Sequence, residues 1–276
     1  MSDVVDRRVI VLPPRRGVQT RALGLAWTRR FRFAAVPVLL LLLWQLSASL
    51  ELVPSLILPS PLQVWQALLA ASAGGTLAAA LEVSLRRLVV GYAFGVALGL
   101  PLGLLFGISP IVRKLIAPSF WFIVRVPLLA WIPFLMVLFG IGEALKLVLI
   151  AKAVMTPVTI NTERAIRGIP AGWRELGRLY RLSPWLTLRR ILFPATVLPV
   201  FTGLRLGLVQ AWAVLVAVEL LASSNGIGFQ LTMARQLFQL DTMLALMAVV
   251  GVIGFLLDRA LALTEQHIAR RFGGAA

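Results

Sequence analysis

Long apolar runs separated by short charged segments dominate the chain after its first 33 residues. Six of these runs are long enough to cross roughly 30 Å of hydrocarbon as helices that rise about 1.5 Å per residue. They are residues 34–50, 88–108, 118–139, 144–160, 195–221 and 242–257. The pattern predicts an all-α integral membrane protein with about six transmembrane helices and a membrane domain over residues 34–263.

A secretory signal peptide competes with a retained helix for the first apolar run. Ser47-Ala48-Ser49 resembles a small-x-small cleavage site. The long basic segment before this run, and the apolar runs after it, favour a helix that stays in the protein.

The segment 51–82 contains no Lys or Arg. After a Leu-Pro-Ser-Pro turn, residues 62–71 place Leu62, Trp65 and Leu69 on one face of a short predicted helix. We expect this helix to lie at the outer membrane interface.

Glycines recur at every fourth position through the run 88–108, which places them along one stripe of a helix. They are Gly91, Gly95, Gly99, Gly103 and Gly107. Such a stripe lets the backbone of a second helix approach closely. We therefore expect this helix to pack tightly on a neighbour.

Charge gives the orientation of the predicted helices. The chain holds 27 Lys and Arg against 11 Asp and Glu, and the basic residues cluster between apolar runs rather than on a face with interleaved aromatics. This distribution favours a lipid bilayer, not a nucleic acid, as the partner. The N-terminal tail and every second segment between the apolar runs, which lie on the same side of the membrane as that tail, together hold 20 Lys and Arg. The segments and helix ends on the other side hold four. The asymmetry predicts that the basic tail 1–33 and the C-terminal tail 264–276 are both cytoplasmic.

Catalytic and metal-binding residues are scarce. There is no cysteine, the single histidine (His267) stands among charged residues near the C-terminus, and no apolar run contains a Ser/His, paired-Asp or His/Glu set. The Gly-x-x-x-x-Gly-Lys-Ser/Thr phosphate loop is also missing from the sequence. We expect this chain to bind no metal or cofactor and not to hydrolyse ATP itself.

The segment 161–194 is too charged for lipid, yet it has helical spacing. In a helix over residues 171–182, one stripe is apolar (Leu176, Leu179 and Tyr180) and another consists of arginines. A second short helix is predicted over residues 185–193. Two short amphipathic helices of this kind either dock on a soluble partner or lie on anionic lipid. The residue pattern alone leaves both alternatives open.

The same segment resembles the cytoplasmic loop of ABC importer permeases. Glu175 matches the Glu of the loop signature, Ser183 stands at the usual Ser eight positions on, and Pro194 follows nineteen positions after the Glu. Two features depart from the signature: Leu176-Gly177 replace Ala-Ala, and Arg181 stands where Gly is usual.

Short motifs from Leu58 to Arg271 extend the resemblance to the nitrate/sulfonate/taurine branch of that family. They include Leu58–Trp65, Ser84–Arg87 with Gly91-Tyr92, Arg125-Val126-Pro127 with Ala130 and Pro133, Phe139–Glu143, Asn161-Thr162, Thr202–Arg205, Ala211-Trp212 and Glu219-Leu220-Leu221.

The resemblance implies a type I importer fold in which two permease copies form the pathway. Two ABC ATPase subunits, which use ATP and Mg²⁺, would dock on the loop, and a periplasmic solute-binding protein would deliver the substrate. The ATPase-coupling residues that it implies are Trp173, Arg174, Glu175, Leu176, Gly177, Arg178, Leu179, Ser183 and Pro194. The substrate expected is a small anion (aliphatic sulfonate, taurine or nitrate), and the alternative function is an ion-gradient-driven secondary transporter.

Ionisable residues inside predicted spans are candidates for the translocation pathway, because an isolated charge in the membrane is costly. Arg125, followed by the helix-breaking Pro127, either attracts an anionic solute or pairs with Glu219. Glu219 either gates the pathway or stabilises the loop that follows it. Trp212 either lines the pathway or packs between helices, whereas Lys152 and Arg205 are expected to reach the membrane surface by snorkelling.

Overall fold

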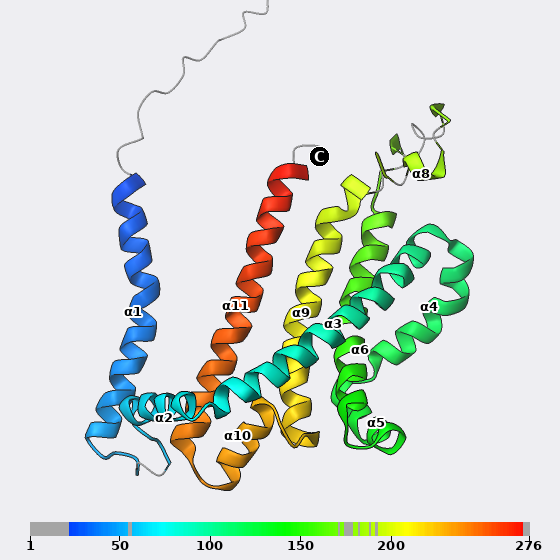
Figure 1. Cartoon of the computed structure of the whole chain (residues 1–276). Coiled ribbons are helices and arrows are strands. Elements are labelled where there is room, and N and C mark those ends of the chain that lie inside the picture. Colours follow the sequence, from blue (N-terminus) through cyan, green and yellow to red (C-terminus); the bar gives the residue numbers. More distant parts are fainter. Residues whose placement is uncertain are drawn as a thin grey trace, which may run out of the picture. The chain divides into compact units, whose positions relative to one another are not determined.

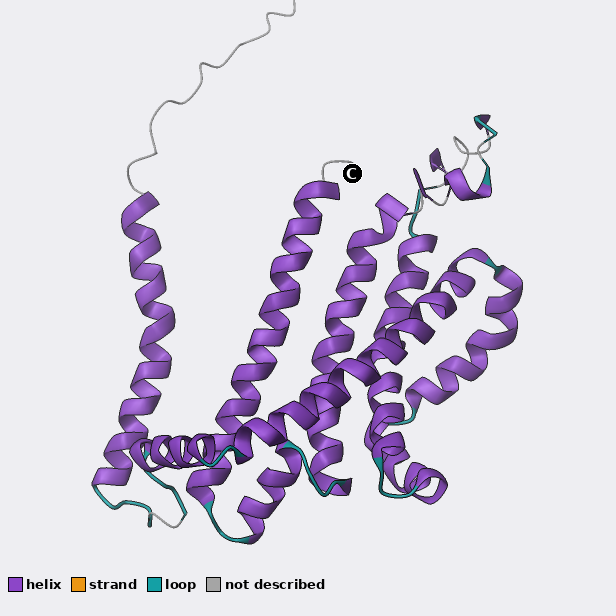
Figure 2. Cartoon of the chain, viewed as in Figure 1, coloured by secondary structure: helices purple, strands orange, loops and turns teal. Residues whose placement is uncertain are grey.

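The structure is a computed structural model that describes residues 22–54, 57–170, 172–173, 179–181, 183–187, 189–190 and 193–272. Every regular element within these residues is a helix, as Figures 1 and 2 show, which confirms the all-α prediction. The chain divides into two units, Met1–Ser55 and Leu56–Ala276, and each is described by itself.

Within residues 22–54, the described part of the first unit, there is one helix, α1 (Ala22–Ser49), which includes nearly all of the predicted run 34–50. The segment 1–33, for which the sequence predicts only a basic tail, is therefore helical from Ala22 onwards. Ala, Leu and Arg, all good helix formers, occupy many of the positions between Ala22 and Arg32. They extend the apolar helix by about three turns toward the N-terminus.

The second unit begins with the short helix predicted after the proline-rich turn, α2 (Pro61–Ala73). Ser60 caps it by accepting from the Gln63 backbone N–H, while the Gln63 side chain accepts from the Ser60 N–H. The expected apolar face of Leu62, Trp65 and Leu69 is exposed within this unit.

Three long helices form the centre of the second unit: α3 (Thr76–Ile108), α6 (Glu143–Arg167) and α9 (Phe193–Ala222). Each is longer than the apolar run that predicted it. The difference is greatest for α3, which begins directly after Gly75, a glycine in the left-handed region at φ 70°. Arg86 and Arg87, expected at an outward helix end, consequently lie inside α3.

The glycine stripe of α3 packs against α6, as the sequence predicts. A Cβ atom added to Gly95 would lie 2.5 Å from Val154 Cβ, and one added to Gly103 would lie 2.6 Å from Thr162 Cβ. A Cβ atom at each of the other three glycines would lie between 2.6 and 3.0 Å from an atom of α6. Thr159 adds an interhelical hydrogen bond by donating from Oγ1 to the Gly99 carbonyl at 3.2 Å.

A second pair of glycines brings α9 close to α6. A Cβ at Gly203 would lie 2.8 Å from Asn161 Cβ, and one at Gly207 would lie 3.2 Å from a methyl group of Val154. Helix α6 therefore lies between α3 and α9, and its apolar residues Ile150, Val154 and Val158 are fully buried in the core shared by these helices.

The predicted span 118–139 is broken. Helix α4 (Pro110–Arg125) ends before Pro127, a single 3₁₀ turn η1 (Leu128–Ala130) follows, and α5 (Trp131–Phe139) leaves at an angle of 88° to α4. Proline has no N–H to donate and disfavours a helical residue before it, which accounts for the break. Figure 1 shows α4 and α5 diverging at this point.

The unit ends with α10 (Ile227–Gln236) and α11 (Leu240–Phe272), and α11 packs along α9. By length and composition, α3, α9 and α11 can each cross a membrane alone, and the bent α4/α5 pair is a candidate fourth span. Helix α6 does not meet these criteria, and it carries several charges. The apolar stretch Ala35–Ser49 is too short to meet them. The chain is a multi-pass helical protein, and six spans remains a prediction.

Candidate functional site

Arg87 lies at the centre of a buried polar cluster that joins four segments of the second unit. Its Nη1 donates to Glu219 Oε1 at 2.7 Å, and its Nε and Nη2 donate to the Glu143 carboxylate at 2.8 and 2.5 Å. Nη1 and Nη2 also donate to the backbone and side-chain oxygens of Asn225. The guanidinium, only 2% exposed, thereby links α3, α6, α9 and the turn before α10.

Glu219, on α9, holds the start of α10 in place. Its Oε2 accepts the Gly228 backbone N–H at 3.0 Å, and both carboxylate oxygens accept from Ser84 Oγ, which in turn accepts from the Ile227 N–H. A carboxylate at a helix N-terminus meets unpaired N–H groups and the positive end of the helix dipole. These contacts stabilise the turn after α9, one of the two roles that the sequence suggested for Glu219.

The Glu143 carboxylate, at the first residue of α6, is half exposed. The hydrogen bonds from Arg87 are the main cause that lowers the pKa of Glu143 to about 2. Lys146, one turn later, lowers this pKa further, with its Nζ 3.3 Å from Glu143 Oε1. Lys146 is itself buried, although the sequence placed it in an outward segment. The two cations and the two glutamates make the cluster neutral, so their burial is compensated.

A pairing of Arg125 with Glu219 is wrong, because Glu219 is fully occupied by Arg87, Ser84 and the N-terminus of α10. Arg125 is the last residue of α4, and its side chain is exposed. None of the described residues forms an ion pair or hydrogen bond with its guanidinium. Pro127 is also exposed and accepts the Ala130 N–H at 3.0 Å, which closes the turn of the bend.

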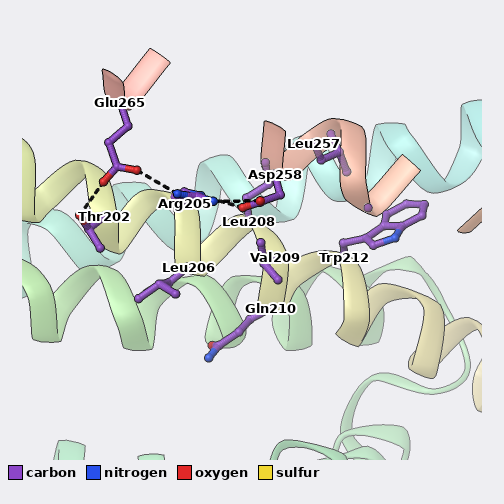
Figure 3. Close-up of a pocket in the computed structure, with 11 residues that line it drawn as sticks. Thr202, Arg205, Leu206, Leu208, Val209, Gln210, Trp212, Leu257, Asp258 and Glu265 are labelled. Atoms are coloured by element: carbon purple, nitrogen blue, oxygen red, sulfur yellow. Dashed lines mark hydrogen bonds and ion pairs between the residues drawn. The ribbon is translucent and has the colours of Figure 1, made fainter. Parts of the chain in front are cut away.

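A groove of about 720 Å³ runs between α9 and α11, and Figure 3 shows the side chains that line it. Arg205 of α9 forms a two-pronged pair with Asp258 at 2.7 and 2.9 Å and a third bond with Glu265 at 3.2 Å. Glu265 also accepts from Thr202. Arg205 thereby joins α9 to α11, and whether it also reaches the membrane surface stays a prediction.

Trp212 lines the same groove and is nearly buried. Its indole Nε1 donates to the Val250 carbonyl of α11 at 3.1 Å, and its ring lies against Gly254. These are helix-packing contacts. Whether Trp212 also lines the pathway stays a prediction.

The coupling residues predicted in 161–194 are only partly described. Arg174, Glu175, Leu176, Gly177 and Arg178 lie outside the described residues. Trp173, Leu179 and Ser183 are exposed, and Ser183 caps α8 (Pro184–Thr187) by accepting the Leu186 N–H. Pro194 lies in the first turn of α9.

Sequence reasoning missed most members of the two ionic clusters. They are Ser84, Arg87, Glu143, Lys146, Asn225, Asp258 and Glu265. The signal that could have found them is that Arg87 and Lys146 directly adjoin apolar residues of long hydrophobic runs. Among the described residues, no three His, Cys, Asp or Glu side chains come together as metal ligands.

Comparison with protein families gives a match over residues 95–270 to the family described as binding-protein-dependent transport system inner membrane component. The match covers more than half of the chain and extends from α3 to α11.

Individual relatives match over most of their length. The chain is 32% identical over 235 residues to the aliphatic sulfonates transport permease protein SsuC of Bacillus subtilis (strain 168), covering 85% of each protein. It is 32% identical to the taurine transport system permease protein TauC of Escherichia coli (strain K12), covering 83% of this chain and 85% of TauC. The nitrate import permease protein NrtB of Synechocystis sp. is also 32% identical, with 86% and 88% covered.

A solved structure has the same fold. A chain from inward-facing conformations of the MetNI methionine ABC transporter superposes with a TM-score of 0.58 at 18% identity. The match covers 67% of this chain and 92% of that one.

Proposed function

Because the chain belongs to the family of binding-protein-dependent transport system inner membrane components, we propose that it is the pathway-forming permease subunit of an ATP-driven importer. The solute is a small molecule or ion that carries an oxyanion group, with aliphatic sulfonate, taurine or nitrate as the candidates. The observation that carries the solute class is the 32% identity, over more than four-fifths of the chain, to permeases named for these three solutes.

In this proposal two copies of the chain form the pathway. Two separate ATPase subunits hydrolyse ATP with Mg²⁺, and a periplasmic solute-binding protein delivers the solute. The absence of a phosphate loop in the sequence supports ATP hydrolysis by a separate subunit. The asymmetry of Lys and Arg supports an orientation in the inner membrane with both termini cytoplasmic.

The coupling helix around Glu175 would transmit the closure of the ATPase to the helices. Exposed apolar side chains at described positions of this loop, Trp173, Leu179 and Tyr180, support docking on a protein partner. The loop also joins α6 directly to α9, so a force applied there reaches the helices that carry Glu143 and Glu219.

The decisive experiment is ATP hydrolysis by the complex that co-purifies with the tagged chain in mild detergent. We expect a co-purified soluble ATPase whose activity is inhibited by vanadate and stimulated by solute-loaded binding protein. A chain that purifies alone under several mild conditions, with no hydrolysis, would contradict the proposal and favour a secondary transporter driven by an ion gradient.

A further inference from the structure

Lys152 differs from the paired cations of the long central helices. Arg87 and Lys146 meet carboxylates in the polar cluster, and Arg205 meets Asp258 and Glu265. Within the described residues no carboxylate lies within ion-pair distance of Lys152, although its side chain is half buried. A cation held inside a membrane helix bundle without a counter-ion is costly. Its retention points to a role that packing does not supply.

The position of Lys152 places it at the level of the break between α4 and α5. Leu145, Leu149 and Lys152 follow one another at spacings of four and three residues, so they share one stripe of α6. The two leucines pack with Ile132 and Leu135 of α5. Further along α6, Met155 packs on the cluster formed by α3 and α4. Lys152 therefore lies between the part of α6 that meets α5 and the part that meets α4.

The immediate neighbour of the ammonium is Trp131, the first residue of α5. Lys152 Nζ lies 5.4 Å from the centre of the indole ring. The indole Nε1 is buried and has no hydrogen-bond acceptor among the described residues. The backbone N–H of Trp131 is paired with carbonyl oxygens of η1, so the indole N–H is its unpaired donor. Two donors thus belong to neighbouring side chains, and no carboxylate among the described residues lies within ion-pair distance of the ammonium.

We propose that Lys152 is an anion-binding residue of the translocation pathway, with Trp131 positioning its ammonium. The ligand is a single oxyanion group, such as a sulfonate or nitrate, that supplies the missing negative charge and acceptor oxygens. The break at Pro127 fits this role, because irregular backbone at membrane depth is tolerated where it is buried in protein or lines a water-filled cavity. This inference deepens the proposed function and rests on it for the identity of the solute.

A direct test uses acetylation of the intact complex by N-hydroxysuccinimidyl acetate, followed by peptide mass spectrometry. Sodium ethanesulfonate at ten times its dissociation constant should slow acetylation of Lys152 about tenfold, since protection scales as one plus the ligand concentration over that constant. Dimethyl sulfone, a neutral sulfonyl compound, should not protect. Lys114, exposed in the first turns of α4, is the internal control and should react equally throughout.

Equal protection by the neutral sulfone would overturn the proposal. So would a Lys152 that stays unreactive in every condition, because the site would then be closed to solutes. The experiment needs neither ATP nor transport, so it reports on Lys152 even if the complex proves not to be an ATP-driven importer.

Transport separates binding from a structural role. In proteoliposomes with the ATPase and the binding protein, Lys152→Gln should lower ethanesulfonate uptake about tenfold, as expected for the loss of one charge-assisted contact. Lys152→Arg should restore most of it, while Lys114→Gln has no effect. The Lys152→Gln complex could instead unfold at a lower temperature and lose uptake only in proportion to the fraction of complex that is unfolded. That result would overturn the proposal and mean that the lysine stabilises the bend.

Discussion

Arg87 Nη1 and Glu219 Oε1 lie 2.7 Å apart, although 132 positions separate the two residues in the chain. Both side chains are almost completely shielded from solvent. Their contact joins the interior of α3 to the last turn of α9, and Glu143 brings the first residue of α6 to the same point.

Replacing Arg87 by Met should therefore destabilise the protein strongly. Glu219 would remain buried without its cation, and removing one partner of a buried ion pair costs about 3–5 kcal/mol. The apparent free energy of unfolding in mild detergent, from denaturant titration, measures the effect. Arg86→Met is the matched control, because Arg86 is exposed on the same helix turn. The prediction fails if the two variants unfold alike, and the double variant Arg87→Met/Glu219→Gln should recover part of the loss.

Substitution of Gly95 by Ala should separate α3 from α6. The added methyl would lie 2.5 Å from Val154 Cβ and 2.7 Å from the Ala151 carbonyl oxygen, so helix backbones have to move. Overpacking of this kind costs about 1–3 kcal/mol, against the 0.5–1 kcal/mol that alanine gains over glycine in a helix.

Gly251→Ala provides the comparison, since nothing lies within 4 Å of a Cβ at Gly251 in α11. That variant should unfold at the same or a higher denaturant concentration than the unchanged protein. A stabilising Gly95→Ala would show that the helices are less tightly packed than the structure indicates.

Reversing the charge of Glu175 should uncouple transport from ATP hydrolysis. In Glu175→Lys the proposed docking surface changes, whereas no membrane helix does. We expect normal membrane insertion, a loss of binding-protein-stimulated hydrolysis and uptake reduced to background. Glu82→Lys, on an exposed face of α3, is the control charge reversal. Uptake by Glu175→Lys at the normal rate would remove the coupling assignment.

Arg125→Gln should impair uptake of an anionic solute without affecting folding. Its guanidinium is exposed and has no partner among the described residues, so the unfolding free energy should change by no more than about 0.5 kcal/mol. Loss of one charge-assisted contact predicts about a tenfold fall in uptake of ethanesulfonate. Arg235→Gln is the matched control, because Arg235 is also an exposed arginine in the last turn of a helix. If both variants transport equally well, Arg125 has no part in the pathway.

Periodic features of the sequence predicted structure well. The four-residue spacing of the glycines predicted the tight face of α3, and the proline-rich turn predicted the start of α2. Pro127 predicted a broken helix. The short motifs predicted the importer permease family, which the match over residues 95–270 confirms. Each of these signals is local, because it depends on backbone freedom or on spacing within one helix.

Features that depend on distant partners were missed. Arg87 was counted among outward helix ends because charge normally marks the end of a span, and its partner Glu219 is far away in sequence. Asp258 and Glu265 were missed as partners of Arg205 because the apolar run of α11 stops before Asp258, while the helix continues to Phe272. Tertiary pairing neutralises these charges inside the helix bundle, and a hydropathy pattern does not register pairing.

The close contact of α3 with α6 fixes the axial register of the two helices. Each stripe glycine faces a particular side chain of α6, so sliding by a fraction of a turn would drive the larger side chains between the glycines into the α6 backbone. The two helices are therefore expected to move together as one rigid unit. In the proposed importer, a change between inward-open and outward-open shapes would then have to occur outside this pair of helices, with the turn at Pro127 the first candidate.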